Sequence, residues 1–202
     1  SDVYKRQRMD AVIDFSAPAS LPALAAYVQR TGTPLVSGTT GYCDEEAARV
    51  NALGSYAPVA VSANFSIGVA VLKHLAAEAA ALLPDFDIEI IETHHRMKKD
   101  APSGTAKLLL SAVNPDGTHL TVFGREGFAP RTAGEIGVHA VRGGTVAGVH
   151  TVSFFGDEEE LSLTHRAESR RIFAIGALKT AEKLKDAPVG LHTLDELLFA
   201  RR

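Results

Sequence analysis

The alternation of short apolar runs with helical patterns in the first third of the chain most constrains its fold. The runs at 12–15, 33–38 and 57–63 predict strands, and the segments 18–30 and 44–53 between them predict helices. Strands that are apolar on both faces and separated by helices are typical of a parallel sheet covered on both sides. We therefore expect an α/β unit in this part of the chain.

Polar residues and a glycine mark the ends of these helices. Ser16 or Ser20 lies where the first helix should begin, and Gly32 lies just past its expected end. Acidic residues open the second helix, where their charge favours the positive end of the helix dipole. These signals support the boundaries of both helices.

The pattern changes after residue 66. An Ala-rich segment at 67–83 predicts a long helix, 87–92 predicts a strand, and 105–113 predicts a short helix. Three further strand-like runs are separated by short Gly-rich or acidic turns. These runs, which predict an antiparallel meander, are 138–143, 148–156 and 160–167.

Two helical patterns, at 170–184 and 193–199, follow the last strand-like run. We interpret the whole as an α/β unit, an inserted α+β unit, and a return to the first unit through these helices. The length of 202 residues fits one large domain or two small ones.

Composition narrows the class of protein. A net charge of −3 provides no general attraction to nucleic acid or acidic membranes, so we expect neither as a partner. The single cysteine, Cys43, excludes an internal disulfide framework and a cysteine-rich metal site, and it fits a reducing compartment. Since no apolar run reaches the roughly 18 residues that would span a bilayer, we expect a cytoplasmic protein.

A cluster of basic and titratable side chains follows the strand at 87–92. Its members are His94, His95, Arg96, Lys98 and Lys99. Ser103 is a natural N-cap for a helix that begins at Gly104 or Thr105. The N–H groups of the first turn and the positive end of the helix dipole favour an anion. The segment therefore predicts a pocket for a small polyanion, with one carboxylate at the helix end and others held by side chains.

Other interpretations of this cluster remain open from the residues alone. A solvated loop beside a capped helix would have the same pattern, because charge runs usually lie at the surface. Adjacent histidines can also indicate a metal site. However, sequence neighbours point in different directions, and no cysteine or acidic ligand lies nearby at a metal spacing, so we expect no metal.

The same segment resembles a family signature. ETHHRMKKDAPSGTA, from Glu92 to Ala106, closely resembles the motif E-x-H-H-x-x-K-x-D-x-P-S-G-T-A of the 4-hydroxy-tetrahydrodipicolinate reductase (dihydrodipicolinate reductase) family. Further blocks look like blocks of that family, in its order. They are DFSAP, SGTTGY, ANFSIGV, GREG, GEIGVHAVRGG, GVHTVSFFG, ELSLTHRAESR and FAIGA. The resemblance extends from Ala11 to the C-terminus.

The resemblance implies an NAD(P)H-dependent reductase of lysine (diaminopimelate) biosynthesis. Its expected reaction is hydride transfer to a cyclic dicarboxylate imine derived from 4-hydroxy-tetrahydrodipicolinate, which yields tetrahydrodipicolinate with loss of water. His94 and Lys98 match positions with acid and proton-donor roles, as expected where hydride arrival builds negative charge. The positions that contact the substrate carboxylates match His95, Lys98, Ser103, Gly104 and Thr105.

The resemblance also implies positions for the nicotinamide cofactor, NADPH or NADH. They match Phe15, Ser16, Gly38, Thr39, Thr40, Ala63, Asn64, Phe65 and, where the chain returns to the first unit, Arg170. The loop at 38–41 follows a strand at its carboxyl end, where ligands bind in open α/β sheets, although a tight turn would have the same sequence. We assign no role to His139 or His150.

The sequence departs from the family in one respect. It contains no G-x-G-x-x-G, and GGTVAG at 143–148 has the wrong spacing for this dinucleotide fingerprint. We therefore interpret the chain as N-terminally truncated, with a partial Rossmann-like sheet that lacks the first strand and the Gly-rich turn, and with impaired cofactor binding. The start, SDVYKRQRMD, contains VYKRQ, which resembles translated sequencing-adapter read-through, so we interpret the first several residues as non-native.

We expect 1–66 and 170–202 to form the remnant of the dinucleotide-binding domain, and 67–169 to form the domain for substrate binding and oligomerisation. Family members are commonly tetramers joined through the sheet of the inserted domain, so we expect a homotetramer joined through the strands of 137–167. One alternative is a catalytically inactive fragment that binds a dicarboxylate or oligomerises. A more distant alternative is an unrelated oxidoreductase with the same layout.

Overall fold

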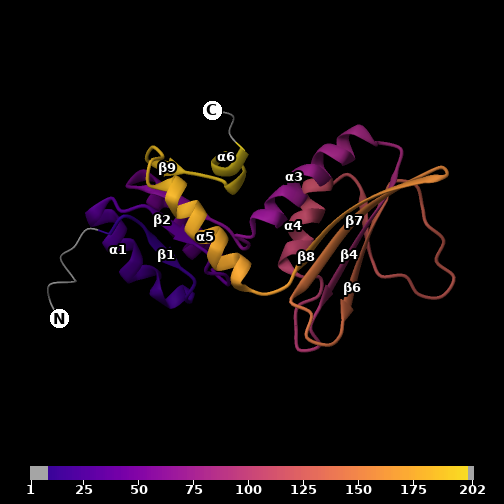
Figure 1. The fold of residues 1–202 in the computed structure, drawn as a ribbon, viewed down its shortest axis with the longest axis horizontal. Coiled ribbons are helices and arrows are strands. Elements are labelled where there is room, and N and C mark those ends of the chain that lie inside the picture. The colour runs from indigo at the N-terminus through magenta and orange to yellow at the C-terminus, as the bar shows by residue number, and fades with distance from the viewer. Residues whose placement is uncertain (1–8, 200–202) are drawn as a thin grey trace. The chain divides into compact units, whose positions relative to one another are not determined.

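The computed structural model describes residues 9–199, which divide into two compact units (Figure 1). Of these residues, the first unit contains 9–66 and 171–199, and the second contains Ile67–Arg170. The interpretation of the start of the chain as non-native falls mainly on residues 1–8, which lie outside the described residues. Within 9–199, no helix is long and apolar enough to cross a membrane.

The first unit is built on a four-stranded sheet in which every pair of neighbours is parallel. In spatial order its strands are β1 (Val12–Asp14), β2 (Leu35–Ser37), β3 (Pro58–Val61) and β9 (Gly190–Leu191). The prediction of a parallel sheet is confirmed for the first three strands. The sequence did not indicate β9, because its two residues are too few to show a periodicity.

Helices separate these strands as the pattern predicted. They are α1 (Leu21–Thr31), α2 (Asp44–Ala52), α5 (Arg171–Leu184) and α6 (Leu194–Phe199), with 3-10 turns η2 (Pro18–Ser20) and η3 (Leu53–Ser55). Gly32 ends α1 in the left-handed conformation at φ 63°, as expected for a C-terminal glycine. The start of α1 differs from the prediction, because Ser20 makes no side-chain cap and its hydroxyl donates to the Ala17 carbonyl instead.

The core of the first unit forms between α1, α2 and the sheet. Its buried members are Leu21, Ala25, Val28, Leu35, Val50, Leu53, Ala57 and Val59. A second close contact lies between α5 and the segment after β3. A side-chain carbon placed on Gly176 of α5 would lie 1.7 Å from the carbonyl oxygen of Phe65, so only glycine fits there.

The second unit contains a mixed five-stranded sheet with the spatial order β5-β6-β4-β7-β8. The strands are β4 (Asp87–His94), β5 (Leu120–Phe123), β6 (Glu135–Arg142), β7 (Gly148–Gly156) and β8 (Glu159–Ala167). β4 runs parallel to β6 and antiparallel to β7, while β5 is parallel to β6. Only β7 and β8 form an antiparallel hairpin.

The expected antiparallel meander of three consecutive strands is therefore wrong for the first of them. β4 lies between β6 and β7, so the connection 143–147 crosses over the end of β4. Crossing one strand spans about 10 Å, a distance that this connection can reach. Backbone hydrogen bonds fix the crossing: Gly143 donates to the His94 carbonyl at 2.9 Å, and Arg96 donates to the Gly144 carbonyl at 3.2 Å.

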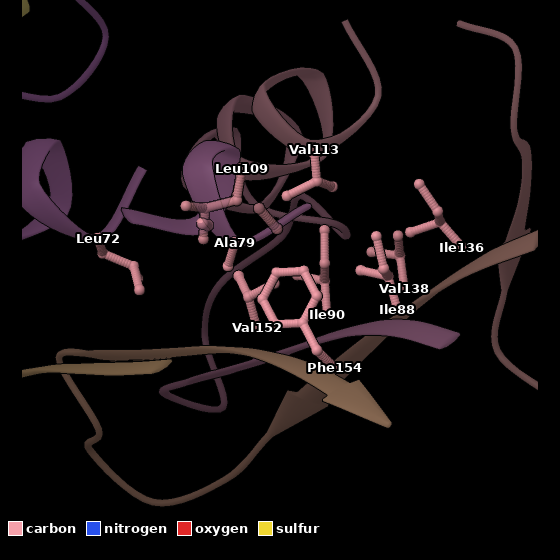
Figure 2. Close-up of a cluster of buried hydrophobic side chains, with 12 residues drawn as sticks. Leu72, Ala79, Ile88, Ile90, Leu109, Val113, Ile136, Val138, Val152 and Phe154 are labelled. Atoms are coloured by element: carbon pink, nitrogen blue, oxygen red, sulfur yellow. The ribbon is translucent and has the colours of Figure 1, made fainter. Parts of the chain in front are cut away.

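Two helices, α3 (Ile67–Leu82) and α4 (Gly104–Val113), lie together on one face of this sheet (Figure 1). Figure 2 shows the core between them, in which apolar side chains of the helices meet those of the central strands. The labelled side chains are Leu72, Ala79, Leu109 and Val113 from the helices, and Ile88, Ile90, Ile136, Val138, Val152 and Phe154 from the strands. Since strand side chains alternate, Glu92 and His94 continue the face of β4 that begins with Ile88 and Ile90.

Candidate active site

The carboxylate of Glu92 lies at the carboxyl end of β4 and is fully buried. Arg142, at the end of β6, donates two hydrogen bonds to it, from Nη2 to Oε1 at 2.7 Å and from Nη1 to Oε2 at 2.8 Å. The Ser103 N–H donates to Oε1 at 3.0 Å, and His94 Nδ1 lies 2.5 Å from Oε2. Burial alone would raise the pKa of Glu92, but hydrogen bonds from Arg142, His94 and Ser103 outweigh it and hold that pKa below its ordinary value.

His94 is buried beside this carboxylate. Burial lowers the pKa of its imidazole, the charges of Lys98 and Arg142 lower it further, and Glu92 opposes them only in part. His94 is therefore mainly neutral at neutral pH. Its other ring nitrogen, Nε2, faces the start of β7, where a side-chain carbon on Gly148 would lie 3.1 Å away.

Lys98 lies on the loop that follows β4. Its Nζ donates to Asp100 Oδ1 at 2.8 Å, and its side chain is one-fifth exposed. The Asp100 carbonyl accepts a hydrogen bond from Arg142 Nη2 at 2.7 Å. The loop that carries Lys98 is therefore tied to β6 by the same arginine that pairs with Glu92.

The loop ends at the first turn of α4. Ser103 caps this helix, and its hydroxyl accepts a hydrogen bond from the Ala106 N–H at 3.2 Å, which confirms the predicted N-cap. Gly104 is exposed, and a side-chain carbon placed on it would meet no atom within 4 Å. Thr105 is half-buried. Space is therefore open beside Gly104 in the first turn of α4, and the positive end of a helix dipole favours an anion.

His150 of β7 completes the buried cluster. Its Nε2 lies 3.1 Å from the Ser103 hydroxyl, and its ring meets that of His94 edge-on at a centroid distance of 5.0 Å. Burial lowers the pKa of His150 to about 4, so the ring is neutral at neutral pH. In the antiparallel pairing of β4 with β7, His150 lies directly opposite Glu92.

Three members of this cluster were missed at the sequence level: Glu92, Arg142 and His150. Glu92 could have been found, because it lies two residues before His94 on a strand and must share its face. Arg142 and His150 approach it only because β6 and β7 flank β4, an order that no local pattern reveals. Of the predicted catalytic and substrate residues, the structure brings together His94, Lys98 and Ser103, with the half-buried His95 on the loop between them.

The residues expected near a cofactor lie mostly at the carboxyl ends of β1, β2 and β3 in the first unit. The buried carboxylate of Asp14 joins the first two loops, because it accepts hydrogen bonds from Thr39 Oγ1 at 2.7 Å and Ser16 Oγ at 2.5 Å. The ring of Phe15 is 49 % exposed and lies so close over Gly38 that a side-chain carbon there would come within 2.3 Å of it. Asp14 was not among the expected residues.

The loop after β3 contacts the loop after β1 through two aromatic rings. Phe15 and the fully buried Phe65 contact each other edge-on at 5.7 Å. Asn64 is buried, and its Oδ1 accepts a hydrogen bond from the Ser66 N–H at 2.8 Å. Thr40 and Ala63 are exposed at the same edge of the sheet.

Arg170 is the remaining residue expected to contact the cofactor. It is exposed and is the last residue of the second unit, between β8 and α5. Across residues 9–199, no three His, Cys, Asp or Glu side chains gather where they could hold a metal ion.

Two family models together match nearly all of the chain. The model described as "Dihydrodipicolinate reductase, N-terminus" matches residues 1–65, and "Dihydrodipicolinate reductase, C-terminus" matches residues 68–198. The chain belongs to the dihydrodipicolinate reductase family. The family resemblance expected from the basic loop is therefore confirmed.

Curated relatives in this reductase family carry the name 4-hydroxy-tetrahydrodipicolinate reductase. The protein from Brachyspira hyodysenteriae is 41% identical over 200 residues, which cover 98% of this chain and 87% of that protein. The protein from Thermomicrobium roseum is 46% identical over 197 residues, which cover 95% of this chain and 76% of that protein.

A solved structure supports the same assignment to the reductase family, and a second one shares the fold. A dipicolinate-bound dihydrodipicolinate reductase from Paenisporosarcina sp. TG-14 has a TM-score of 0.77 and 26% identity, and the match covers 94% of this chain and 74% of that chain. An amine dehydrogenase from Mycobacterium smegmatis has a TM-score of 0.60 at 12% identity, which is a likeness of fold alone. The expected α/β fold, with a Rossmann-like parallel sheet and a second α+β unit, is confirmed.

Proposed function

We propose that this chain is an NAD(P)H-dependent reductase that converts 4-hydroxy-tetrahydrodipicolinate to tetrahydrodipicolinate in lysine biosynthesis. The main supporting observation is the cluster formed by the buried Glu92 and His94 with Arg142, in a chain of this reductase family. Lys98 and the start of α4 lie beside this cluster. The second unit would bind the dicarboxylate, and the first would bind the cofactor.

The substrate carboxylates would be held by cations and N–H groups around the loop after β4. We assign this role to His95, Lys98, Ser103, Gly104 and Thr105. The open space beside Gly104 supports a carboxylate at the start of α4. In the structure Lys98 pairs with the exposed carboxylate of Asp100, an anion that a substrate carboxylate can replace.

Reduction consumes one hydride and one proton at the bound ring. We assign the acid and proton-donor roles to His94 and Lys98, which lie on either side of the turn after β4. The positive charge of Lys98 and the dipole of α4 would stabilise the negative charge that develops as the hydride arrives. Lys98 can then donate the proton that balances the reaction.

A pyridine nucleotide, NADPH or NADH, would supply the hydride when bound. The residues at the carboxyl ends of β1 to β3 fit such a group, because small side chains and backbone line these loops and the half-exposed Phe15 ring offers a flat apolar surface. We assign the cofactor contacts to Phe15, Ser16, Gly38, Thr39, Thr40, Ala63, Asn64 and Phe65. Arg170 stays a candidate for a cationic contact with the same ligand.

We also propose a homotetramer joined through the five-stranded sheet, in the cytoplasm. The face of this sheet opposite α3 and α4 carries exposed apolar side chains, which include Ile91, Val141 and Phe155. Burial of such a face between copies would remove apolar surface from water. The free Cys43 fits a reducing compartment. Sedimentation equilibrium would test the tetramer, and a monomer at micromolar concentration would contradict it.

The substrate site can be tested with pyridine-2,6-dicarboxylate, a planar mimic of the substrate, in ligand-observed saturation-transfer NMR. We expect binding to the full chain that weakens with added salt and is lost in Lys98→Ala. Lys99→Ala, one residue further along the same loop and exposed, is the matched control and should keep binding. Failure of the folded wild-type chain to bind would contradict the proposed dicarboxylate site.

An activity assay on the same sample can distinguish a reductase from a catalytically inactive fragment that only binds the dicarboxylate. Oxidation of NADPH or NADH with 4-hydroxy-tetrahydrodipicolinate would support the reductase. Dicarboxylate binding without any oxidation of either nucleotide would instead favour the catalytically inactive fragment.

A further inference from the structure

Glu92 makes more contacts than the pairing of one charge requires. Each of its two oxygens accepts two hydrogen bonds: Oε1 from Arg142 and the Ser103 N–H, and Oε2 from Arg142 and His94. The donors come from β4, from β6 and from the cap of α4. A fully buried carboxylate needs such partners, but one paired arginine would satisfy much of that need.

We propose that Glu92 is the positioning residue of this site, which fixes the proton of His94 on Nδ1 and, through Arg142, anchors the loop that carries Lys98. This inference rests on the proposed function, since it concerns the two residues to which we assign proton transfer. It assigns Glu92 no contact with the substrate.

The first part of the inference concerns the tautomer of His94. An ionised carboxylate only accepts hydrogen bonds, and the bidentate contact with Arg142 keeps Glu92 ionised. His94 must then donate from Nδ1, which leaves Nε2 as the nitrogen that gains or loses a proton. Nε2 faces Gly148, where the absence of a side chain leaves room beside the ring.

The second part concerns the position of Lys98. From Glu92 the chain of contacts continues through Arg142 to the Asp100 carbonyl at 2.7 Å, and from the Asp100 carboxylate to Lys98 Nζ at 2.8 Å. Arg142 can reach the carbonyl in this orientation because Glu92 holds its guanidinium in the plane of the carboxylate. Loss of Glu92 would therefore release both His94 and the loop.

Glu89 offers a matched control on the same strand. It also pairs with arginines, Arg125 and Arg131, and its Oε2 lies 2.7 Å from Nε2 of His139. Since it lies three residues before Glu92, it points to the opposite face of the sheet. Glu89→Gln thus removes the same charge from a similar cluster without touching His94.

The test measures the His94 tautomer by long-range ¹H–¹⁵N NMR on the full chain, together with the Kd for pyridine-2,6-dicarboxylate. In the wild type we expect the proton on Nδ1. In Glu92→Gln the carboxamide also donates a hydrogen bond, so we expect the Nε2–H form of His94 to appear and Kd to rise by about tenfold or more. Glu89→Gln should leave both quantities at their wild-type values.

A wild-type His94 with its proton on Nε2 would overturn the inference, as would a folded Glu92→Gln variant with unchanged tautomer and Kd. Should Glu92→Gln not fold, Arg142→Lys separates the two parts. A lysine keeps Glu92 charged but cannot make the planar contact, so we expect Nδ1–H to persist while Kd rises. An unchanged Kd in Arg142→Lys would overturn the anchoring part. Failure of the wild type to bind the dicarboxylate would count against the proposed function, while the tautomer of His94 would still decide this inference.

Discussion

His150 of β7 lies 3.1 Å from the hydroxyl of Ser103, the residue that caps α4. This contact joins a buried ring to the start of the helix that we assign to the substrate carboxylates. It also places a group with an altered pKa in the buried interior of the second unit. The stability of that unit should therefore depend on pH.

We expect the unfolding temperature to fall as the pH drops from 6.5 to about 4. Burial lowers the pKa of His150 from 6.5 to about 4 in the folded chain, so the unfolded chain binds more protons in this window and stability rises with pH through it. Above pH 6.5 the contribution of the neutral His150 ring to stability is complete and no longer changes with pH. Differential scanning calorimetry in His150→Gln should show a flatter profile in this window, whereas the exposed His74→Gln should follow the wild type.

Glu92 adds a second pH dependence below this window. Its pKa is lowered in the folded chain, so its contribution is present above the unfolded value of 4.5 and is lost as the pH falls through the folded value. We expect Glu92→Gln to remove this acid-side slope and to leave the His150 slope. A wild-type chain equally stable at pH 3 and pH 6 would contradict both assignments.

Removal of the α4 cap should cost measurable stability. Ser103→Ala deletes the acceptor of the Ala106 N–H and the partner of His150, so we expect a loss of about 1–2 kcal/mol in the free energy of unfolding. Urea denaturation would measure it. Ser111→Ala changes an exposed serine on the same helix and should stay within about 0.5 kcal/mol of the wild type.

Asp100→Asn should strengthen binding of pyridine-2,6-dicarboxylate. The substitution removes the anion that pairs with Lys98 and would repel a carboxylate, while the backbone carbonyl that accepts from Arg142 stays. Because exposed ion pairs contribute up to about 1 kcal/mol, we expect Kd to fall by up to about fivefold. Asp116→Asn, on a distant exposed turn, is the control. Weaker binding in Asp100→Asn would instead show that the Asp100 carboxylate is needed to position Lys98.

Substitution by alanine should have different effects on stability at two glycines. At Gly176 the new carbon would lie 1.7 Å from the Phe65 carbonyl oxygen, which is backbone, so we expect Gly176→Ala to destabilise the first unit by about 3 kcal/mol or more. At Gly104 nothing lies within 4 Å, so Gly104→Ala should be neutral or stabilise by up to about 1 kcal/mol. Equal effects of the two substitutions on urea denaturation would contradict the close contact of α5.

The sequence predicted the parts of this molecule that depend on neighbours along the chain. The cap at Ser103 and the helix end at Gly32 are examples, because each depends on a few adjacent residues. The sequence alone could not predict that Arg142 and His150 lie around Glu92. Their placement depends on β4 entering between β6 and β7, whereas the short turn between those two strands favoured direct pairing.

The discontinuity of the first unit also has a consequence for synthesis. The second unit, Ile67–Arg170, is synthesised before α5, which packs on the sheet of the first unit, and before β9, which is the last strand of that sheet. A chain released from the ribosome shortly after Arg170 would contain the whole second unit but would lack α5 and β9. We expect proteases to cleave β1 to β3 in such a chain, while β4 to β8 are protected.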